Sequence, residues 1–166
     1  RCTGTAPHKC GMSLTSTCGL AGILNIKSML VMVQLEVGQR LTAPVGSSEY
    51  SAVSILCGYL AQLRIVRKVP PEVFYPRPKV QSAVMSLNPV APSPDASLYG
   101  ALKKLVQPVF HYRRKTIRVA LEKSGCFSSK EVIEMILSRS GIKGELRPQD
   151  IPLAGYLNLV KEKRIN

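Results

Sequence analysis

The feature of the sequence that most constrains its fold is a proline-rich segment that leads directly into a strand pattern. In VPPEVFYPRPKVQSAVMSL, residues 69–87, prolines occupy positions 70, 71, 76 and 78. Each proline fixes its own φ and restricts the residue before it, so Phe74 and Tyr75 are predicted to lie in an extended loop with little conformational freedom. The alternating residues from Val80 to Leu87 then predict a β-strand.

Two further strands and one helix are predicted before this segment. MLVMVQLE, which starts at Met29, is a short apolar run that suits a buried strand, and the β-branched LRIVRKV at 63–69 predicts a second strand. Between them, residues 48–61 are predicted to form an amphipathic helix that is capped by Ser47 or Ser48. The order strand, helix, strand, loop, strand is typical of the end of an α/β layer.

A linker rich in proline and serine, NPVAPSPDAS at residues 88–97, separates these elements from the rest of the chain. Beyond it the pattern is helical. The first helical stretch, residues 98–125, is predicted to be interrupted or kinked around Pro108 and to end at Gly125, and a second begins at a capping box formed by Ser128 and Glu131. We therefore expect a small helical domain over residues 98–166.

Composition favours a protein that binds nucleic acid. Lys+Arg 23 against Asp+Glu 10 gives a formal net charge of +13. Such an excess indicates a polyanionic partner, most often nucleic acid, and the alternative is a basic surface that serves only solubility. The 5 cysteines include no CxxC pair, which argues against a metal site or a disulfide framework. Free thiols and the lack of a membrane-length apolar run predict a soluble, cytoplasmic protein.

Two basic groups are candidates for phosphate binding. In FHYRRKTIR, residues 110–118, a single helix would place Arg114 and Arg118 one turn apart, with His111 and Tyr112 available for stacking. The second group flanks the proline-rich loop and consists of Arg64, Arg67, Lys68, Arg77 and Lys79. A rigid aromatic residue between such cations suits an unpaired base, although an aromatic residue that closes a sheet edge would have the same sequence.

Several motifs, in order, resemble those of the ribosomal RNA adenine dimethyltransferases. That family reads close to M-V-Q-x-E-V-x-x-R-L, then S-x-x-Y-x-x-L-S, then V-P-P-x-x-F-x-P-x-P-K-V-x-S-A-V, and residues 32–84 resemble all three. Its F-x-x-R-R-K-T-x-R is matched by residues 110–118, and its late G-I…R-P-x-x-L resembles the segment from Gly141 to Ile151. The resemblance covers roughly residues 30–160.

The resemblance implies a partial Rossmann-like methyltransferase sheet, of which this chain holds the last three strands, followed by a small α-helical C-terminal domain. The implied segments are 29–87 for the end of the α/β domain, 88–97 for the linker and 98–166 for a helical RNA-docking domain, while 1–28 does not match the family. In this family S-adenosylmethionine donates methyl groups to adjacent adenines near the 3′ end of small-subunit ribosomal RNA during ribosome biogenesis.

The resemblance also implies residue roles. Phe74 matches the aromatic residue that the family places against the target base, which such enzymes take out of its stack. The positions expected to contact RNA are matched by Arg77, Lys79, Arg113, Arg114, Lys115, Arg118 and Arg147. The implied partner is small-subunit ribosomal RNA or a precursor particle of the small subunit, bound by a monomer.

The motifs that hold the cofactor in this family have no counterpart in the sequence. They are a glycine-rich G-x-G loop, acidic residues after the next two strands, and an N-L-P-Y tetrapeptide that holds the target amine. We therefore expect a fragment that does not bind S-adenosylmethionine and is not catalytic as written, and no catalytic residue is assigned. Without neighbouring strands, the sheet should also expose an edge and apolar faces, which favours aggregation.

Two alternatives remain open. The chain could be a non-catalytic RNA-binding or ribosome-assembly module derived from the same family. It could also belong to an antibiotic-resistance methyltransferase that acts on large-subunit RNA, but FHYRRKT and the extended helical tail favour the small-subunit group. The mitochondrial transcription-factor relatives are less favoured still.

Overall fold

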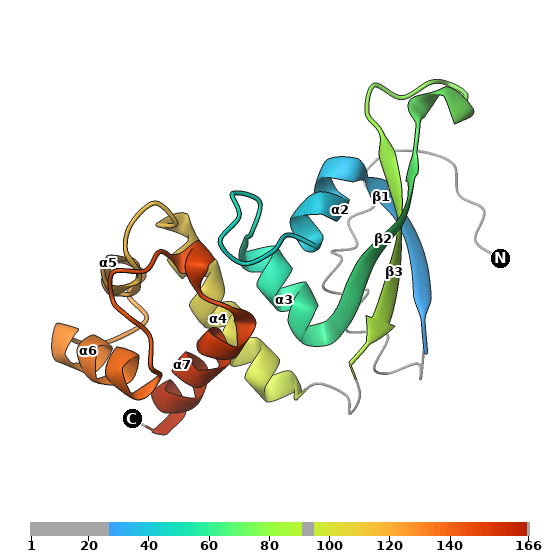
Figure 1. Ribbon diagram of the computed structural model, residues 1–166. Helices are drawn as coiled ribbons and strands as arrows, with labels where there is room; N and C mark the ends of the chain where they lie inside the picture. The colour runs from blue at the N-terminus through green and yellow to red at the C-terminus, as the bar shows by residue number, and fades with distance from the viewer. Residues whose placement is uncertain (1–26, 91–94, 166) are drawn as a thin grey trace.

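The computed structural model describes residues 27–90 and 95–165, which form a small sheet with two helices on one face and a bundle of four helices beside it (Figure 1). The predicted segment 1–28 and the middle of the predicted linker therefore lie largely outside the described residues. The first residues of that linker belong to a strand that ends at Pro89, and its last belong to a helix that begins at Ala96.

The three predicted strands are present. They are β1 (Met29–Gln34), β2 (Ala61–Val69) and β3 (Ser82–Pro89), in the spatial order β1-β3-β2. β3 is antiparallel to both neighbours, so β1 and β2 run parallel to each other. The register aligns inward-facing side chains across the sheet, because Leu87 of β3 lies opposite Met29 of β1 and Leu63 of β2.

Within the described residues, helices cover only one face of this sheet. Ala83, Met85 and Leu87 of β3 are buried beneath α2 (Leu35–Leu41) and α3 (Ala52–Leu60). On the other face of β1, Leu30 is 68% exposed and Met32 57% exposed. The prediction of a buried β1 strand is therefore only half right, because an apolar run does not show whether a second layer covers it.

The sequence analysis did not predict α2, and it placed the start of α3 too early. α2 follows β1 without a loop and packs directly on the sheet, since a Cβ at Gly38 would make ordinary contacts, 3.4 Å from Met85 Sδ and 3.5 Å from Ala83 Cβ. α3 begins after Ser51, whose backbone amide donates to Ser54 Oγ at 3.1 Å. The cap is thus Ser51, and not Ser47 or Ser48.

The helical domain consists of α4 (Ala96–His111), α5 (Ile117–Lys123), α6 (Lys130–Arg139) and α7 (Leu153–Ile165). α4 continues through Pro108, so the helix is not interrupted there, and the break in the predicted 98–125 helix lies after His111. Because proline has no amide hydrogen, it leaves the carbonyl four residues earlier without its helical partner. Cys126 Sγ lies 3.7 Å from that carbonyl of Lys104 and donates to it.

Turn chemistry explains the other helix boundaries. Gly125 and Gly141 have φ of 64° and 67°, and each follows the end of a helix as predicted for C-terminal capping. The start of α6 differs from the prediction by one residue, because Ser129 and not Ser128 accepts a hydrogen bond from the backbone of Val132, at 3.4 Å. Local capping signals therefore located these ends to within one residue.

α3 joins the sheet to the helical domain. Its Cys57 and Leu60 pack against the sheet, whereas its Ile55 and Leu56 belong to the core of the helical domain. Tyr50, just before α3, packs edge-on against Phe110 of α4, with ring centroids 6.4 Å apart. Figure 1 shows α3 between the sheet and α4, so the two parts form one packed unit despite the linker between them.

Candidate nucleic-acid interface

The β2–β3 hairpin carries the first candidate surface at its tip, defined here as residues 70–81. The hairpin extends beyond the helices that cover the sheet (Figure 1). Its pairing shifts register between Ile65 and Arg67, so Val66 is an extra residue that bends the strand. A short 3₁₀ turn, η1 (Pro71–Val73), leads into the loop, and the peptide bond between Tyr75 and Pro76 is cis.

The tip presents its two aromatic residues differently. Phe74 has extended backbone dihedrals, its amide donates to the carbonyl of Pro71 at 3.3 Å, and its side chain is partly covered. Tyr75 is fully exposed. The structure thus places the predicted base-stacking residue, Phe74, at the tip, and it exposes a second aromatic residue to which the sequence analysis assigned no role.

The two predicted cations of the tip also differ. Arg77 forms a charge-assisted hydrogen bond with Glu72, in which both side chains are more than half exposed. Lys79 is exposed and forms no ion pair or hydrogen bond with any described residue. Lys79 is therefore the more available of the two for a phosphate, because Arg77 would first have to leave its carboxylate.

The second candidate surface is the turn between α4 and α5, Tyr112–Thr116, which we call the α4–α5 turn. The prediction of a single helix through this segment is wrong, since Arg114 lies in the turn and Arg118 in α5. Hydrogen bonds within the turn hold it, including one from the amide of Lys115 to the carbonyl of Tyr112 at 2.8 Å. Arg114 and Lys115 are exposed and have no ionic partner among the described residues.

The two ring side chains beside this turn are not equally accessible. Tyr112 packs against the helical core, and Lys123 Nζ lies 6.0 Å from the centroid of its ring. His111 is exposed. Of the two rings that the sequence suggested for stacking, only His111 is open to solvent without rearrangement.

Arg113 connects this turn to the sheet half of the molecule. Its Nη2 donates to the backbone carbonyl of Ser48 at 2.8 Å. Ser48 lies in the loop between α2 and α3, which is also joined to the helical domain by a 2.8 Å hydrogen bond from the amide of Gly46 to the carbonyl of Gln149. Gly46 has φ of 86°, a conformation that favours glycine. Arg113 therefore has a structural partner as well as an exposed side.

Arg118 is not the free cation that the prediction assumed. Its guanidinium pairs with Glu134 of α6 and, at 3.5 Å, with Glu145 of the loop before η2 (Pro148–Asp150). A Cβ at Gly144 would lie only 2.7 Å from Arg118 Nη2. Two carboxylates thus offset the charge of Arg118, and the side chain joins three segments of the helical domain.

Arg147, the last of the predicted RNA contacts, lies at the start of η2. Its side chain is exposed, and its backbone amide donates to Asp150 Oδ2 at 3.1 Å. Next to it, Tyr156 of α7 is buried and donates through its hydroxyl to the carbonyl of Pro148 at 2.8 Å. Arg147 is therefore held at a fixed place on the surface by a well-packed 3₁₀ turn.

A groove lies where the start of α3 faces the end of α4. It has a volume of about 980 Å³. Its basic lining side chains are Arg40 and Arg113, with His111 beside them and Glu49 as the one acid. The other lining residues are Ser48, Ser51, Ala52, Val53, Gln107, Pro108 and Phe110. This groove extends the surface of the α4–α5 turn toward the sheet.

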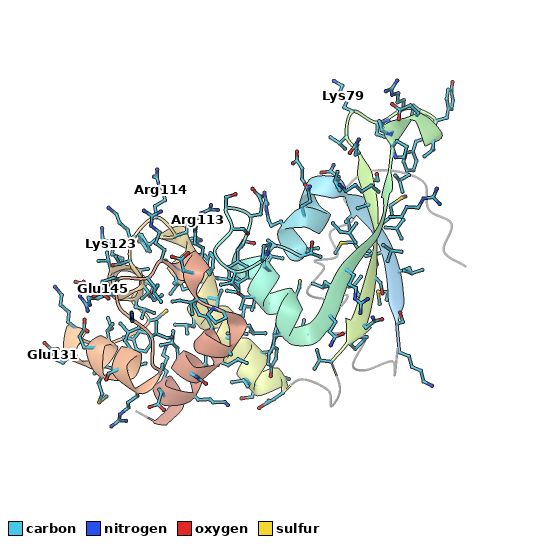
Figure 2. The ribbon with its side chains drawn as sticks, in the orientation of Figure 1. Lys79, Arg113, Arg114, Lys123, Glu131 and Glu145 are labelled. Carbon is cyan, nitrogen blue, oxygen red and sulfur yellow. The ribbon has the colours of Figure 1, made fainter. Side chains whose placement is uncertain are left out.

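The labelled side chains show how charge is distributed (Figure 2). Lys79 at the hairpin tip and Arg114 on the α4–α5 turn project toward the same side of the view, while Glu131 and Glu145 lie at the end of the helical domain that is far from the sheet. Among the residues that the structure describes, no group of three or more His, Cys, Asp or Glu could hold a metal ion. Within the same residues, no helix has the length and apolar character needed to cross a membrane.

Comparisons with known proteins agree with the motifs. The chain matches the family model "Ribosomal RNA adenine dimethylase" over residues 1–164, a range that includes residues 1–28, where the sequence analysis found no family motif. It is 31% identical over 159 residues to ribosomal RNA small subunit methyltransferase A of Treponema denticola, which covers 94% of this chain and 53% of the relative. The same enzyme of Pelotomaculum thermopropionicum is 35% identical over 137 residues, or 81% and 46% of the two chains. The chain thus spans about half the length of the curated relatives it matches.

Solved structures show the same fold. A dimethyladenosine transferase from Plasmodium falciparum superposes with a TM-score of 0.70 at 23% identity, over 87% of this chain and 60% of that one. The 23S rRNA methyltransferase ErmE superposes with a TM-score of 0.56 at 20% identity, over 83% and 55%. The described sheet and helices therefore have a methyltransferase-like fold.

Proposed function

Because the chain belongs to the ribosomal RNA adenine dimethylase family, we propose that it is part of an enzyme that methylates small-subunit ribosomal RNA. The family consists of methyltransferases, whose methyl donor is S-adenosylmethionine. The proposed targets are adjacent adenines near the 3′ end of that RNA, modified during ribosome biogenesis. We further propose a cytoplasmic monomer that meets its RNA in a precursor of the small subunit.

One observation carries this proposal. The proline-rich hairpin tip and the basic α4–α5 turn, which hold the most specific family motifs, belong to one packed unit and project to the same side of it (Figure 2). An enzyme that extracts a base from structured RNA needs an aromatic face for the base and cations for the flanking phosphates. The tip supplies the first through Phe74, and both surfaces supply the second.

The structure supports a division of roles among the predicted residues. Phe74 is proposed to support the ring of the target adenine, which aligns its amine with the methyl group. Lys79, Arg114 and Lys115 are proposed as phosphate contacts, because they are exposed and unpaired among the described residues. Arg113 has a carbonyl partner and Arg118 two carboxylate partners, so we propose that both mainly position the surface.

We propose that this chain by itself does not bind S-adenosylmethionine. The sequence contains no G-x-G motif. Among the described residues, the glycines with positive φ are Gly46, Gly125 and Gly141, and each forms a turn between packed segments. The described residues therefore do not fit the glycine-rich loop that this family uses for its cofactor, and no methyl-transfer step is assigned to them.

Calorimetric titration of S-adenosylmethionine into the chain tests this part of the proposal, with RNA affinity measured in parallel over a series of salt concentrations. The expected result is no cofactor binding, together with RNA binding that weakens steeply with salt. Cofactor binding at micromolar levels would show that the chain builds a site we have not identified. Failure to bind RNA at low salt would refute the docking role.

A non-catalytic RNA-binding or ribosome-assembly module is the second candidate. It is supported by the helical domain, whose buried core and exposed basic turn are complete among the described residues and need no cofactor. Joining to residue 29 the part of a relative that this chain does not match separates the two candidates. Restored methylation of small-subunit RNA would support the enzyme, whereas a folded, RNA-binding hybrid without activity would support the module.

In such an active hybrid, Phe74→Ala tests the proposed role of the aromatic residue. We expect methylation to be lost while RNA affinity changes less than about threefold, because stacking on the target base acts mainly on the geometry of transfer. Equal loss of methylation and RNA affinity would instead mean that Phe74 supports the structure of the tip.

A further inference from the structure

The hairpin tip places an aromatic side chain where folding gains nothing from it. Tyr75 is fully exposed, and its neighbour Val73 is 65% exposed. A buried tyrosine contributes through the apolar area it removes from water, and Tyr75 removes none. Its packing therefore does not explain why so large an apolar ring lies at the end of the longest projection of the sheet (Figure 1).

The backbone around Tyr75 reduces the entropy cost of binding a ligand. Prolines at 70, 71, 76 and 78 restrict the loop on both sides, and a 3₁₀ turn closes it at Pro71–Val73. An exposed group that is already restricted loses less freedom when a partner immobilises it. The tip is thus a preformed platform.

The two aromatic residues of the tip differ in exposure. Phe74 is partly covered, and its amide donates to the carbonyl of Pro71 at 3.3 Å, whereas Tyr75 is fully exposed. A fully exposed ring offers its face to a partner without any rearrangement of the tip. Tyr75 can therefore bind a group other than the one proposed for Phe74.

The charges around Tyr75 indicate the chemistry of that group. Arg77 and Lys79 lie within four residues of it, and Arg67 and Lys68 are exposed on the strand that leads to the tip. The one acid of the tip, Glu72, is engaged by Arg77. An aromatic face surrounded by cations is complementary to an unpaired base whose phosphates are negatively charged.

We propose that Tyr75 is a second base-stacking residue, which binds an unpaired nucleobase of the RNA other than the target base proposed for Phe74. The inference rests on the proposed function, because it assumes that the tip approaches RNA. It adds a contact with a neighbouring nucleotide, which holds the strand in place while the target base is turned out.

Three variants of the present chain test the inference. Tyr75→Leu keeps an apolar side chain without a π-face, Tyr75→Phe keeps the ring, and Lys79→Met removes a nearby cation. The probe is an RNA hairpin with 2-aminopurine in its unpaired loop, and a blunt duplex of the same stem is the control. Affinity, its dependence on salt, and 2-aminopurine quenching are measured for each.

We expect Tyr75→Leu to weaken binding to the loop RNA by roughly 5- to 150-fold, to abolish quenching and to leave the salt dependence unchanged, as loss of one stacked base predicts. Tyr75→Phe should bind as the unchanged chain does, and duplex binding should be the same for both. Lys79→Met should reduce the salt dependence and retain quenching.

Three results would overturn the inference. If the unchanged chain binds the RNA with steep salt dependence but Tyr75→Leu binds equally well, Tyr75 makes no base contact, although the proposed function survives. The same conclusion follows if Tyr75→Leu and Tyr75→Phe lower the affinity for the loop RNA equally. If the unchanged chain binds neither RNA, the docking part of the proposed function fails, and this inference fails with it.

Discussion

In the helical domain, apolar side chains from four helices close over one another, whereas helices of the described ranges 27–90 and 95–165 cover only one of the two faces of the sheet. Leu105, Ile117 and Tyr156 are at most 1% exposed in the helical core. On the sheet, the inner residues of β3 are buried as deeply, those of β1 and most of those of β2 are only partly buried, and Leu30 and Met32 of β1 remain more than half exposed on the outer face. The same chain thus contains one closed core and one that is open on one side.

Because of this difference, the residues that stabilise the fold are not the residues proposed to bind RNA. The closed core gives the helical domain its own source of stability, and α3 extends that core to the sheet through Ile55 and Leu56. The proposed RNA-contacting groups, Lys79, Arg114 and Lys115, lie outside both cores. Their replacement should therefore change binding with little effect on folding, while the open sheet face accounts for the expected tendency to aggregate.

The largest expected effect is on the free energy of unfolding, for which we compare Leu105 of the closed helical core with Met32 on the open sheet face. Leu105→Ala should lower the free energy of unfolding by about 3 kcal/mol, because it leaves a cavity in a closed core. Met32→Ala should change it by less than about 0.5 kcal/mol, since that side chain is 57% exposed. Urea unfolding measures both. Similar losses in the two variants would mean that the outer sheet face is covered in solution.

Tyr156→Phe should lower the free energy of unfolding by about 1.5 kcal/mol. The change leaves the carbonyl of Pro148 without the hydroxyl that donates to it at 2.8 Å in a buried setting. The test is again urea unfolding near neutral pH, with Tyr75→Phe as the exposed control, for which no loss is expected. A loss below about 0.3 kcal/mol would show that another donor replaces the hydroxyl.

The same tyrosine should make stability fall in alkali. Burial raises the pKa of Tyr156 well above its usual value and that of Tyr50 to about 12. The unfolded chain therefore loses these phenolic protons first, near pH 10, so stability is complete below that pH and declines as pH rises above it. Tyr156→Phe should make this decline shallower. If the free energy of unfolding falls as steeply between about pH 9 and 11 in Tyr156→Phe as in the unchanged chain, the raised pKa of Tyr156 is contradicted.

Gly155 in the helical domain and Gly38 beside the sheet differ in how tightly their surroundings are packed. A Cβ at Gly155 of α7 would lie 2.8 Å from Cγ2 of the buried Ile151, whereas at Gly38 the nearest atom would be 3.4 Å away. Gly155→Ala should lower the free energy of unfolding by about 1 kcal/mol, because the steric cost exceeds the gain in helix propensity. Gly38→Ala should be neutral or slightly stabilising. Thermal unfolding that shows stabilisation by Gly155→Ala would contradict the packing seen in α7.

The smallest expected effect is on the salt dependence of RNA affinity, in which Arg113 and Arg114 should differ. Arg114→Met should reduce the slope of log affinity against log salt by about 1 and leave stability unchanged. Arg113→Met should affect the slope less, but it should speed hydrogen exchange in the loop around Ser48, whose carbonyl it releases. If Arg113→Met lowers the slope as much as Arg114→Met and exchange is unchanged, Arg113 is a phosphate contact and not a positioning residue.

Aggregation is the simplest check on the open sheet face. Leu30→Lys and Met32→Lys place charge where both side chains are exposed, so they should raise the concentration at which the chain stays monomeric without lowering its stability. Light scattering over a concentration series measures this. A large loss of stability on either change would show that β1 has a partner on that face.

The sequence by itself determined the elements whose signals are local. A short apolar run predicted β1, a β-branched run predicted β2 and alternation predicted β3, while glycine predicted the ends of α5 and α6 and the motifs around Phe74 and Arg114 predicted the family. These signals depend on residues within a few positions of one another, where backbone preferences and side-chain periodicity act directly.

Only the tertiary structure decided features that depend on distant partners. α4 continues through Pro108, and Cys126, far along the chain, donates to the carbonyl that the proline leaves free. Arg118 is offset by carboxylates from α6 and the loop that follows it, and Tyr75 is exposed while Phe74 beside it is not. Composition shows that a cation or a ring is present, but whether it is paired, covered or free depends on which segments the fold brings beside it.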